Sequence, residues 1–138
     1  MKLLTKDADY AIRALMYLAK NKGRFVSSKE IAQAERIPLY YVRRILQKLV
    51  QSKVIRSKEG VGGGLEILRN PYEIYLADMI RLFRGDIRIS ECMFRKKICP
   101  NRAGCVVRKR IQGIEKKIIE EFEQISIGNL LDDIGGKK

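Results

Sequence analysis

The amino-acid sequence predicts a mainly α-helical fold with one small β-hairpin. Apolar residues recur at spacings of three and four in several stretches, which is the periodicity of amphipathic helices. A single pair of alternating runs flanks a glycine-rich tip at residues 54–68, which is typical of a hairpin. The chain has 138 residues, 46% of them apolar, so its length suits one domain or one domain with an appendage.

The first predicted helix covers residues 6–20. Thr5 can cap its N-terminus, and Asp7 and Asp9 favour the positive end of the helix dipole. Gly23 lies in the short segment that ends the helix. The stripe that we expect to be buried consists of Ala8, Ala11, Ile12, Leu15, Leu18 and Ala19.

Two helices joined by a tight turn follow at residues 28–52. The shorter one, 28–35, begins after Ser27, which has capping-box spacing to Glu30. After a turn that contains Pro38, the longer helix has one apolar face and one basic and aromatic face. This pair is typical of a helix-turn-helix that binds DNA. Its candidate DNA contacts are Ser28, Lys29, Leu39, Tyr40, Tyr41, Arg43, Arg44, Gln47 and Lys48.

The hairpin at residues 54–68 is interpreted as the wing that follows a helix-turn-helix. Its first strand carries Arg56 and Lys58, and its tip contains Gly62 and Gly63, which are further candidate DNA contacts. The spacing of these glycines matches neither the P-loop of nucleotide-binding proteins nor the dinucleotide-binding fingerprint, so we exclude a nucleotide site.

A helix over residues 74–84 completes a winged helix-turn-helix domain that we assign to residues 1–84. Residues 106–134 then contain a long dimerisation helix, about 106–123, and a C-terminal segment. We expect this helix to pair with a second copy, since a complete small domain leaves nothing to cover it. The alternative is packing on the first helix of its own chain. The predicted dimerisation seam is Ile111, Ile114, Ile118, Phe122 and Ile125.

The net charge of the chain is +13, and it is unevenly distributed. Residues 1–112 carry +15, whereas residues 113–138 carry −2. A basic body with a near-neutral tail predicts a polyanionic partner, and the helix-turn-helix indicates double-stranded DNA. The chain has no histidine, which excludes an imidazole base, and it shows no substrate-site constellation, so we expect no enzyme.

The longest unbroken apolar run has six residues, Ala14 to Ala19. A membrane span needs about 20, so we expect no membrane partner. No apolar signal-peptide core follows the N-terminus, and we therefore expect a cytoplasmic protein.

The three cysteines, Cys92, Cys99 and Cys105, lie within fourteen residues, and we assign the segment 85–105 to a cluster-binding loop. Basic residues surround them, and nearby positive charge favours thiolates, which bind soft metals and iron–sulfur clusters. Three readings stay open on spacing alone. Structural zinc is the weakest because no close cysteine pair or histidine is present. A metal-free thiol switch needs only two cysteines, and an iron–sulfur cluster suits a wider three-cysteine loop.

The order of these elements, with three spaced cysteines between a winged helix and a long helix, resembles the Rrf-two family of bacterial regulators. That family includes the iron–sulfur cluster regulator and the nitrite-sensitive, nitric-oxide-sensing repressor. The resemblance extends over nearly the whole chain. The matching stretches are Leu4-Thr5-Lys6, Tyr10-Ala11-Ile12-Arg13, Ile31-Ala32, Ile37-Pro38-Leu39-Tyr40-Tyr41, Gly60 with Gly62-Gly63-Gly64, and Ile125-Ser126-Ile127-Gly128.

The resemblance implies a homodimeric winged-helix regulator that holds a 2Fe–2S or 4Fe–4S cluster. It places three cluster thiolates at Cys92, Cys99 and Cys105, and a fourth ligand at Asp9 of the partner subunit. The histidine that one branch uses as fourth ligand is absent here. Arg43-Arg44 and Glu59 depart from other members at positions that face DNA, so an operator sequence cannot be transferred.

Together these observations predict a transcription regulator, in the repressor class, whose affinity for a palindromic operator depends on an iron–sulfur cluster. Nitric oxide, redox state or iron–sulfur supply would be the signal. The alternatives are a metal-free thiol-switch repressor and a small iron–sulfur redox protein.

Overall fold

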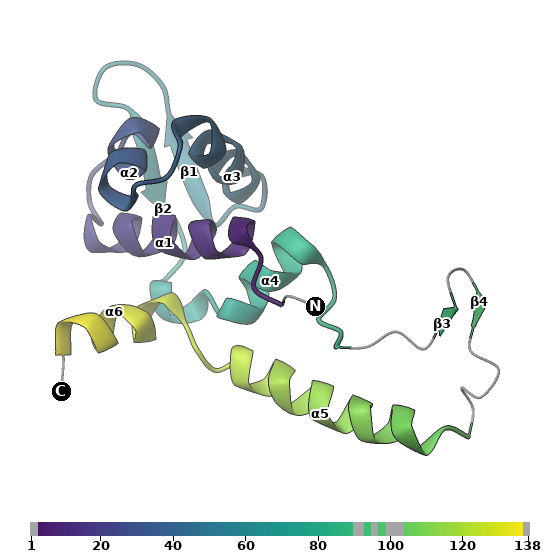
Figure 1. Ribbon diagram of the computed structural model, residues 1–138. Coiled ribbons are helices and arrows are strands. Elements are labelled where there is room, and N and C mark those ends of the chain that lie inside the picture. Colours follow the sequence, from purple (N-terminus) through teal and green to yellow (C-terminus); the bar gives the residue numbers. More distant parts are fainter. Residues whose placement is uncertain (1–2, 90–92, 95–96, 99–103, 137–138) are drawn as a thin grey trace.

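The structure is a computed structural model that describes residues 3–89, 93, 94, 97, 98 and 104–136. Within them it is mainly α-helical with two small antiparallel hairpins, which confirms the predicted fold class. Helices α2 and α3 and the wing lie on one side of α1, and α4 and α6 lie on the other, while α5 extends away from this body (Figure 1). The elements in chain order are α1 (Lys6–Lys20), α2 (Ser28–Glu35), α3 (Leu39–Gln51), β1 (Ile55–Lys58), β2 (Gly64–Ile67), the 3₁₀ helix η1 (Pro71–Glu73), α4 (Leu76–Arg84), β3 (Met93–Phe94), β4 (Lys97–Ile98), α5 (Val106–Phe122) and α6 (Ile127–Gly136).

Helix α1 has the predicted start and end. The Oγ1 atom of Thr5 accepts a hydrogen bond from the backbone N–H of Ala8 at 3.2 Å, so one of the free N–H groups at the helix start is satisfied. Asp7 and Asp9 lie in the first turn, and the helix ends at Asn21. The predicted stripe is buried except at Ala19, which is half-buried.

Helices α2 and α3 form the predicted helix-turn-helix. Ser27 caps α2 by accepting the backbone N–H of Glu30 at 3.0 Å. Arg36 ends α2 in the left-handed conformation, with a φ of 58°, and this lets the chain turn sharply into α3. The turn brings the apolar face of α3, which includes Val42, Ile45 and Leu49, against α1.

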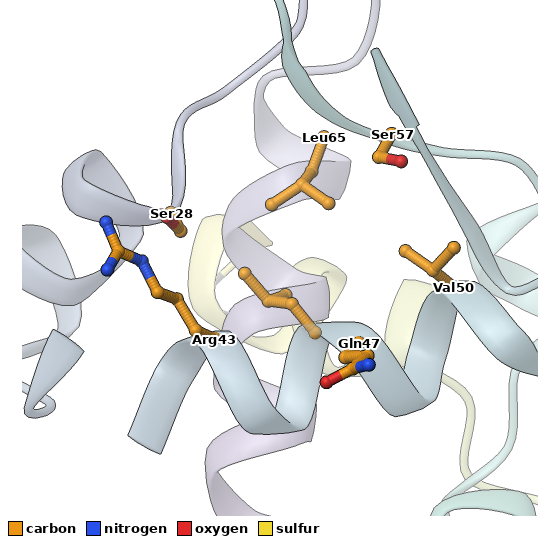
Figure 2. Close-up of a pocket in the computed structure, with 7 residues that line it drawn as sticks. Ser28, Arg43, Gln47, Val50, Ser57 and Leu65 are labelled. Carbon is orange, nitrogen blue, oxygen red and sulfur yellow. The ribbon is translucent and has the colours of Figure 1, made fainter. Parts of the chain in front are cut away.

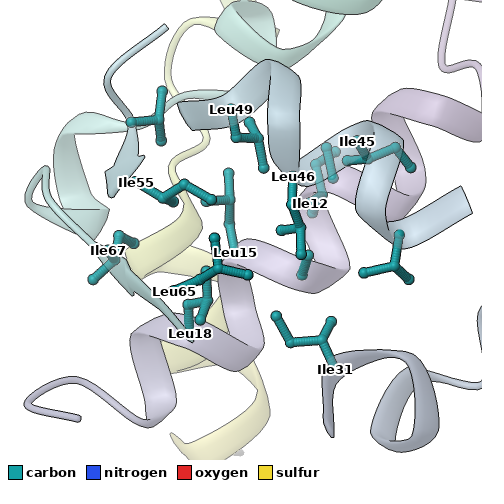
Figure 3. Close-up of a cluster of buried hydrophobic side chains, with 14 of the residues drawn as sticks. Ile12, Leu15, Leu18, Ile31, Ile45, Leu46, Leu49, Ile55, Leu65 and Ile67 are labelled. Atoms are coloured by element: carbon teal, nitrogen blue, oxygen red, sulfur yellow. The ribbon is translucent and has the colours of Figure 1, made fainter. Parts of the chain in front are cut away.

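The main hydrophobic core lies where α1 crosses α3 and the inner face of the wing (Figure 3). Leu15 of α1 and Leu49 of α3 are fully buried, and Ile55 and Ile67 of the wing are 1% and 5% exposed. Full burial of one such side chain contributes about 1.5–3 kcal/mol. The orientation of α3 relative to the wing is therefore set by a shared core rather than by surface contacts.

The wing is an antiparallel hairpin in which Ile55 pairs with Ile67 and Lys58 pairs with Gly64. A third segment joins it, because Val26 and Leu65 exchange two backbone hydrogen bonds of 2.8 and 2.7 Å. Gly64 lies so close to this segment that a Cβ atom there would be 2.6 Å from the carbonyl oxygen of Val26. A glycine at this position thus allows the wing to attach to the chain that precedes α2.

Helices α4 and α6 and the 3₁₀ helix η1 form a layer under α1. An isolated bridge between Tyr75 and Ser126 joins the chain before α4 to the chain before α6. Ser126 and Asn129 cap α6 reciprocally, with hydrogen bonds of 3.0 and 2.9 Å. Ile127 is fully buried in the main core, so α6 returns to the body formed by α1, α3 and the wing.

The C-terminal part differs from the prediction in one respect. The predicted helix over about 106–123 matches α5, but we also placed Ile125 on its seam, whereas α5 ends at Phe122 and α6 begins at Ile127. The carbonyl of Ile125 accepts the backbone N–H of Leu76 at 2.9 Å, so Ile125 belongs to the connection that pairs with the α4 layer. The change of direction comes from the capping by Ser126, whose side chain satisfies the start of a new helix.

Helix α5 has no fully buried residue. Its C-terminal end contacts the α4 layer, where Ile119 and Phe122 pack beside Ala77, Ile80 and Ile87. Polar contacts also join α5 to α4 and the segment that follows it. Glu123 pairs with Arg81 at 2.9 Å, and Glu115 accepts the N–H of Ile89 at 2.9 Å. Among the described residues, the rest of the apolar seam of α5 is only partly covered: Ile111 and Ile118 are half-buried, and Ile114 is 48% exposed.

The segment that we predicted as a loop, 85–105, contains a short hairpin. Strands β3 and β4 pair with Met93 opposite Ile98 and Phe94 opposite Lys97. Gly85 ends α4 as predicted, with a φ of 98°. Cys92 and Cys99 lie outside the described residues.

Candidate nucleic-acid interface

The outer face of α3 is polar, basic and solvent-exposed. Tyr40 is 72% exposed, and Arg43, Arg44, Gln47 and Lys48 are exposed as well. The ammonium group of Lys48 lies 5.5 Å from the centre of the Phe83 ring of α4, a distance that allows a cation–π interaction. The face therefore offers the donors that a recognition helix needs for base edges and phosphates.

A hollow of about 270 Å³ lies between α3, the start of α2 and the wing (Figure 2). Its apolar lining comes from Leu46, Val50 and Leu65. Its polar groups are the hydroxyls of Ser28 and Ser57, the guanidinium of Arg43 and the amide of Gln47. Hydroxyl, amide and guanidinium donors are the groups that proteins use to contact a DNA backbone.

Tyr41 and Arg44 have partners within the protein. The Tyr41 hydroxyl donates a hydrogen bond to the carboxylate of Asp7 in α1, and this bond raises the pKa of Tyr41. The Arg44 guanidinium stacks 4.4 Å from the centre of the Tyr41 ring and lies 3.5 Å from Asp7. Tyr10 packs edge-on against Tyr41, with ring centres 5.0 Å apart. Tyr41 therefore attaches the start of α3 to α1.

The remaining candidates in the helix-turn-helix differ in exposure. Leu39 is half-buried and packs against the main core, so it supports α3 from below. Lys29 is exposed at the start of α2, next to Ser28 in the hollow. Ser28 thus lies on the same side as Arg43, whereas Leu39 does not extend this surface.

The two wing cations are held over one aromatic ring. Arg56 lies 5.3 Å and Lys58 lies 5.4 Å from the centre of the Phe25 ring. Arg56 also pairs with Glu66 on the neighbouring strand, at 2.7 Å. At the tip, the N–H of Gly63 donates to the carbonyl of Gly60, and Gly62 has a φ of 78°.

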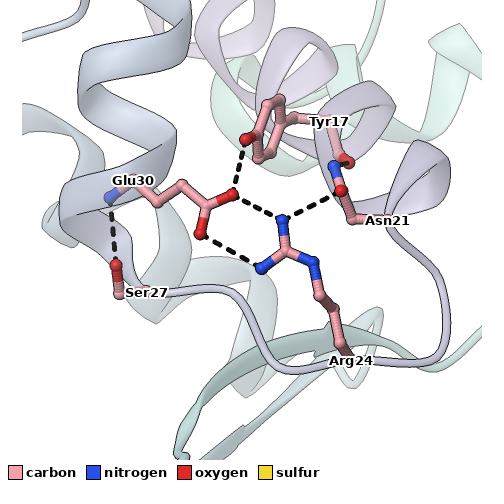
Figure 4. Close-up of polar contacts among 5 residues, drawn as sticks. All are labelled: Tyr17, Asn21, Arg24, Ser27 and Glu30. Carbon is pink, nitrogen blue, oxygen red and sulfur yellow. Dashed lines mark hydrogen bonds and ion pairs between the residues drawn. The ribbon is translucent and has the colours of Figure 1, made fainter.

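A polar cluster joins α1 to the start of α2 (Figure 4). Arg24 donates to both carboxylate oxygens of Glu30, at 3.1 and 2.6 Å, and to Asn21 at 2.9 Å. Tyr17 donates to Glu30 at 2.5 Å. These hydrogen bonds, first from Arg24 and then from Tyr17, lower the pKa of Glu30 to about 2. Glu30 thus uses its carboxylate for Arg24 and Tyr17, and the predicted capping box is formed only by Ser27.

Cys105 is the one predicted cluster ligand of the cysteine set that lies among the described residues. It is half-buried at the N-cap of α5, and its sulfur accepts the backbone N–H of Arg108 at 3.3 Å. A cysteine sulfur is the donor that iron–sulfur clusters use. The chemistry of this donor thus fits an iron–sulfur cluster, although the described residues alone bring no three metal-binding side chains together.

Asp9 lies in the first turn of α1, and its carboxylate accepts the Nε–H of Arg13 at 3.1 Å. Both side chains are exposed, by 37% and 53%. An exposed pair of this kind contributes little to stability, so the carboxylate can exchange Arg13 for another partner at small cost. Asp7, two residues earlier, is engaged with Tyr41 and Arg44 of α3.

Three side chains of this interface were absent from the sequence-based candidates: Asp7 as a partner of α3, Phe25 under the wing and Ser57 in the hollow. Each of these side chains belongs to the interface because it lies next to residues that are distant in the sequence. The sole local signal was that Ser57 lies between Arg56 and Lys58 on a predicted strand.

Across the described part of the chain, no helix combines the length and the apolar character needed to cross a lipid bilayer.

Comparison with known proteins assigns this architecture to a family. The family model described as Rrf2, iron-dependent transcriptional regulator, matches residues 4–133. A putative HTH-type transcriptional regulator of Aquifex aeolicus is 29% identical over 125 residues, which are 89% of this chain and 87% of that protein.

Two solved structures have the same fold. T. potens IscR superimposes with a TM-score of 0.78 at 23% identity, covering 100% of this chain and 91% of that one. CymR, the global cysteine regulator of B. subtilis, gives a TM-score of 0.76 at 22% identity, covering 96% and 98%. Because the family model spans nearly the whole chain and the relatives are regulators, the chain belongs to the Rrf2 family and is a DNA-binding transcription regulator rather than an enzyme.

Proposed function

We propose that the protein is a homodimeric repressor that binds a palindromic operator through α3 and the wing. The observation that carries this proposal is the continuity of the surface. The exposed face of α3 and the strand β1 border the same hollow, through Arg43 and Gln47 on α3 and Ser57 on β1. In this arrangement Tyr40, Arg43 and Gln47 enter the major groove, while Arg56 and Lys58 reach the flanking backbone or minor groove.

We further infer that an iron–sulfur cluster controls this binding. Cys92, Cys99 and Cys105 would hold the cluster, which supplies the chemistry that responds to nitric oxide, redox state or iron–sulfur supply. Support comes from the iron-dependent description of the family, from the basic surroundings of the cysteines and from the position of Cys105 at a helix start.

Asp9 of the partner subunit is the proposed fourth ligand. The contacts of α1 favour Asp9 over Asp7, because Asp7 binds Tyr41 and Arg44, whereas among the described residues the side chain of Asp9 pairs with the exposed Arg13 alone. A ligand on α1 would connect the cluster to the helix that supports α3. Loss of that connection would change the spacing of the two recognition helices, which must match successive major grooves about 34–36 Å apart.

A metal-free thiol switch is the second candidate function. The likeness of the fold to CymR, named as a cysteine regulator, favours this alternative, as does the clustering of three cysteines within fourteen residues. A small iron–sulfur redox protein, which we also considered, does not agree with membership in a family of transcription regulators.

Absorption and Mössbauer spectra of the anaerobically purified protein separate the two candidates. A cluster gives visible absorbance and an iron signal, and both are lost in Cys92→Ala, Cys99→Ala and Cys105→Ala, because two thiolates and one carboxylate cannot hold it. If the cysteine variants keep the full absorbance, or if the wild-type protein contains no iron, the cluster proposal is wrong and the thiol switch replaces it.

The fourth ligand is tested with a matched pair, Asp9→Ala and Asp7→Ala. We expect Asp9→Ala to assemble a cluster that is lost faster in air, because water or an external thiol can occupy the vacated position. Asp7→Ala should keep the air stability of the wild-type cluster and instead weaken DNA binding, since it removes the partner of Tyr41 and Arg44. The opposite pattern would assign the ligand to Asp7.

A further inference from the structure

We propose that Phe25 is a positioning residue for DNA binding, whose ring orients the two wing cations, Arg56 and Lys58, toward the DNA backbone. This inference rests on the proposed role of the wing. Phe25 lies before α2 in the chain, outside both the helix-turn-helix and the hairpin.

The first argument is the geometry of the two cations. Arg56 and Lys58 are two residues apart on β1, so their side chains leave the same face of the strand. Their charged groups lie 5.3 and 5.4 Å from the centre of one ring, within the distance of about 6 Å at which cation–π attraction operates. One aromatic side chain thus restrains both cations.

The second argument is that the two cations differ in their other partners. Arg56 donates to Oε1 of Glu66 through Nε at 2.9 Å and Nη2 at 2.7 Å, so it has a carboxylate partner besides the ring. Within the described ranges, Lys58 has no carboxylate within ion-pair distance, and its ammonium group lies 5.4 Å from the centre of the Phe25 ring. The ring therefore matters most for Lys58, whose long side chain is otherwise free to adopt many rotamers.

The third argument is the rigidity of the backbone that carries the ring. On one side, Val26 forms two hydrogen bonds with Leu65 of the wing. On the other side, Arg24 binds Glu30 in the first turn of α2. The backbone on both sides of Phe25 is thus tied to the wing and to the helix-turn-helix at once. Binding DNA then costs less ordering of side chains.

The experiment compares Phe25→Leu and Phe25→Trp in the wild-type background and in the double variant Arg56→Ala/Lys58→Ala. The probe is a fluorescent DNA duplex that the wild-type protein enriches from a random-sequence pool, hereafter the selected duplex. Affinity is measured by anisotropy on anaerobic preparations with matching absorption spectra, and thermal unfolding is followed by circular dichroism.

We expect Phe25→Leu to weaken binding about 3–10-fold, and Phe25→Trp, which keeps an aromatic face, to stay within about twofold of wild type. In the Arg56→Ala/Lys58→Ala background, Phe25→Leu should have almost no further effect, since no cations remain to orient. A merely structural role would weaken binding equally in both backgrounds, and that result would overturn the inference. Equal losses for the leucine and tryptophan variants would do the same.

The controls separate this inference from the proposed function. If Arg56→Ala/Lys58→Ala weakens binding but Phe25→Leu does not, the wing contact stands and the role of Phe25 is wrong. If Arg56→Ala/Lys58→Ala has no effect, both the wing contact and the role of Phe25 are wrong, while binding through α3 is tested separately by Arg43→Ala. Should Phe25→Leu fail to fold, Phe25→Met takes its place with the same expectations.

Discussion

Arg43 and Arg44 are neighbours in the sequence, but their guanidinium groups have different surroundings. Arg43 borders the hollow beside Ser28 and Gln47, where it faces the expected path of DNA. Arg44 is stacked on Tyr41 and paired with Asp7 of α1. Side chains that are one residue apart on a helix point about 100° apart, which follows from 3.6 residues per turn. The two arginines therefore serve different purposes.

We expect Arg43→Ala to weaken binding to the selected duplex by about 1–3 kcal/mol, the usual value for loss of a base contact. Arg44→Ala should have a smaller effect and lower the slope of log affinity against log salt by at most about one, as expected for one phosphate. Fluorescence anisotropy at several salt concentrations measures both quantities. If both variants bind the selected duplex with the affinity of the wild-type protein, α3 does not present this face to DNA.

The carboxylate of Glu30 makes the stability of the fold depend on pH. Its pKa is lowered to about 2 in the folded protein by Arg24 and Tyr17, from 4.5 in the unfolded chain. The ionised carboxylate therefore stabilises the fold above about pH 4.5, and this contribution is lost as the pH falls toward 2. The side chain is 35% exposed, so solvent screening reduces the contribution to the order of 1 kcal/mol.

Glu30→Gln should accordingly lower the free energy of unfolding near neutral pH. In this variant the free energy of unfolding should also fall less steeply as the pH drops from about 5.5 to 2.5. Urea unfolding across this range measures the effect. Glu35→Gln, on the same helix and outside the cluster with Arg24, is the matched control and should keep the wild-type pH profile. A wild-type profile for Glu30→Gln would mean that the ion pair does not stabilise the fold.

At the scale of elements, α6 is attached to the body through a close contact between a glycine and a ring. A Cβ atom at Gly128 would lie 2.4 Å from Cδ1 of Tyr72 in η1. The Tyr72 hydroxyl donates to Asp132 of α6, at 2.7 Å to one oxygen and 2.8 Å to the other, and this raises the pKa of Tyr72. The ring can lie this close to α6 because position 128 has no side chain.

Gly128→Ala should therefore destabilise the protein by about 1–3 kcal/mol, as overpacking of a close contact does. Gly113→Ala is the control, because a Cβ atom in the middle of α5 meets nothing within 4 Å and alanine favours a helix. Thermal unfolding compares them. In a Tyr72→Ala background the Gly128→Ala effect should shrink, and an unchanged melting temperature for Gly128→Ala alone would contradict the packing argument.

At the scale of the whole molecule, α5 extends about 25 Å, as 17 residues at 1.5 Å each require. Within the described part of the chain, its C-terminal end packs beside α4, through Ile119 and Phe122. Val107 is 64% and Ile114 is 48% exposed, and Ile111 and Ile118 lie on the same face. Such a face is stable in water when a second copy covers it. The proposed homodimer thus uses the part of the seam that the chain itself leaves open.

We expect Ile111→Glu/Ile114→Glu to yield a folded monomer that binds the selected duplex weakly, because the half-sites are no longer linked. Sedimentation velocity and circular dichroism measure mass and fold. Lys116→Glu, on the opposite face of α5, should remain dimeric. A double variant that keeps the mass of the wild-type assembly would exclude this face as the dimer interface.

The sequence by itself determined the local architecture. The spacing of apolar residues predicted α1, α2, α3 and most of α4 and α5, and Thr5, Ser27 and Gly85 marked helix ends that the structure confirms. These features depend on residues a few positions apart, so periodicity and capping chemistry are sufficient to predict them. The exposed face of α3 followed from the same periodicity.

The tertiary structure alone decided the contacts between distant residues. It placed Ile127 in the core and Ile125 outside α5. It also joined Asp7 to Tyr41 of α3, 34 residues away, and brought Phe25 close to the two wing cations. Each of these positions depends on how the helices and the wing pack around α1, which buries apolar area without regard to sequence distance. No local pattern at Asp7 or Phe25 records its partner, because the energy of these contacts arises only after the core has brought the elements together.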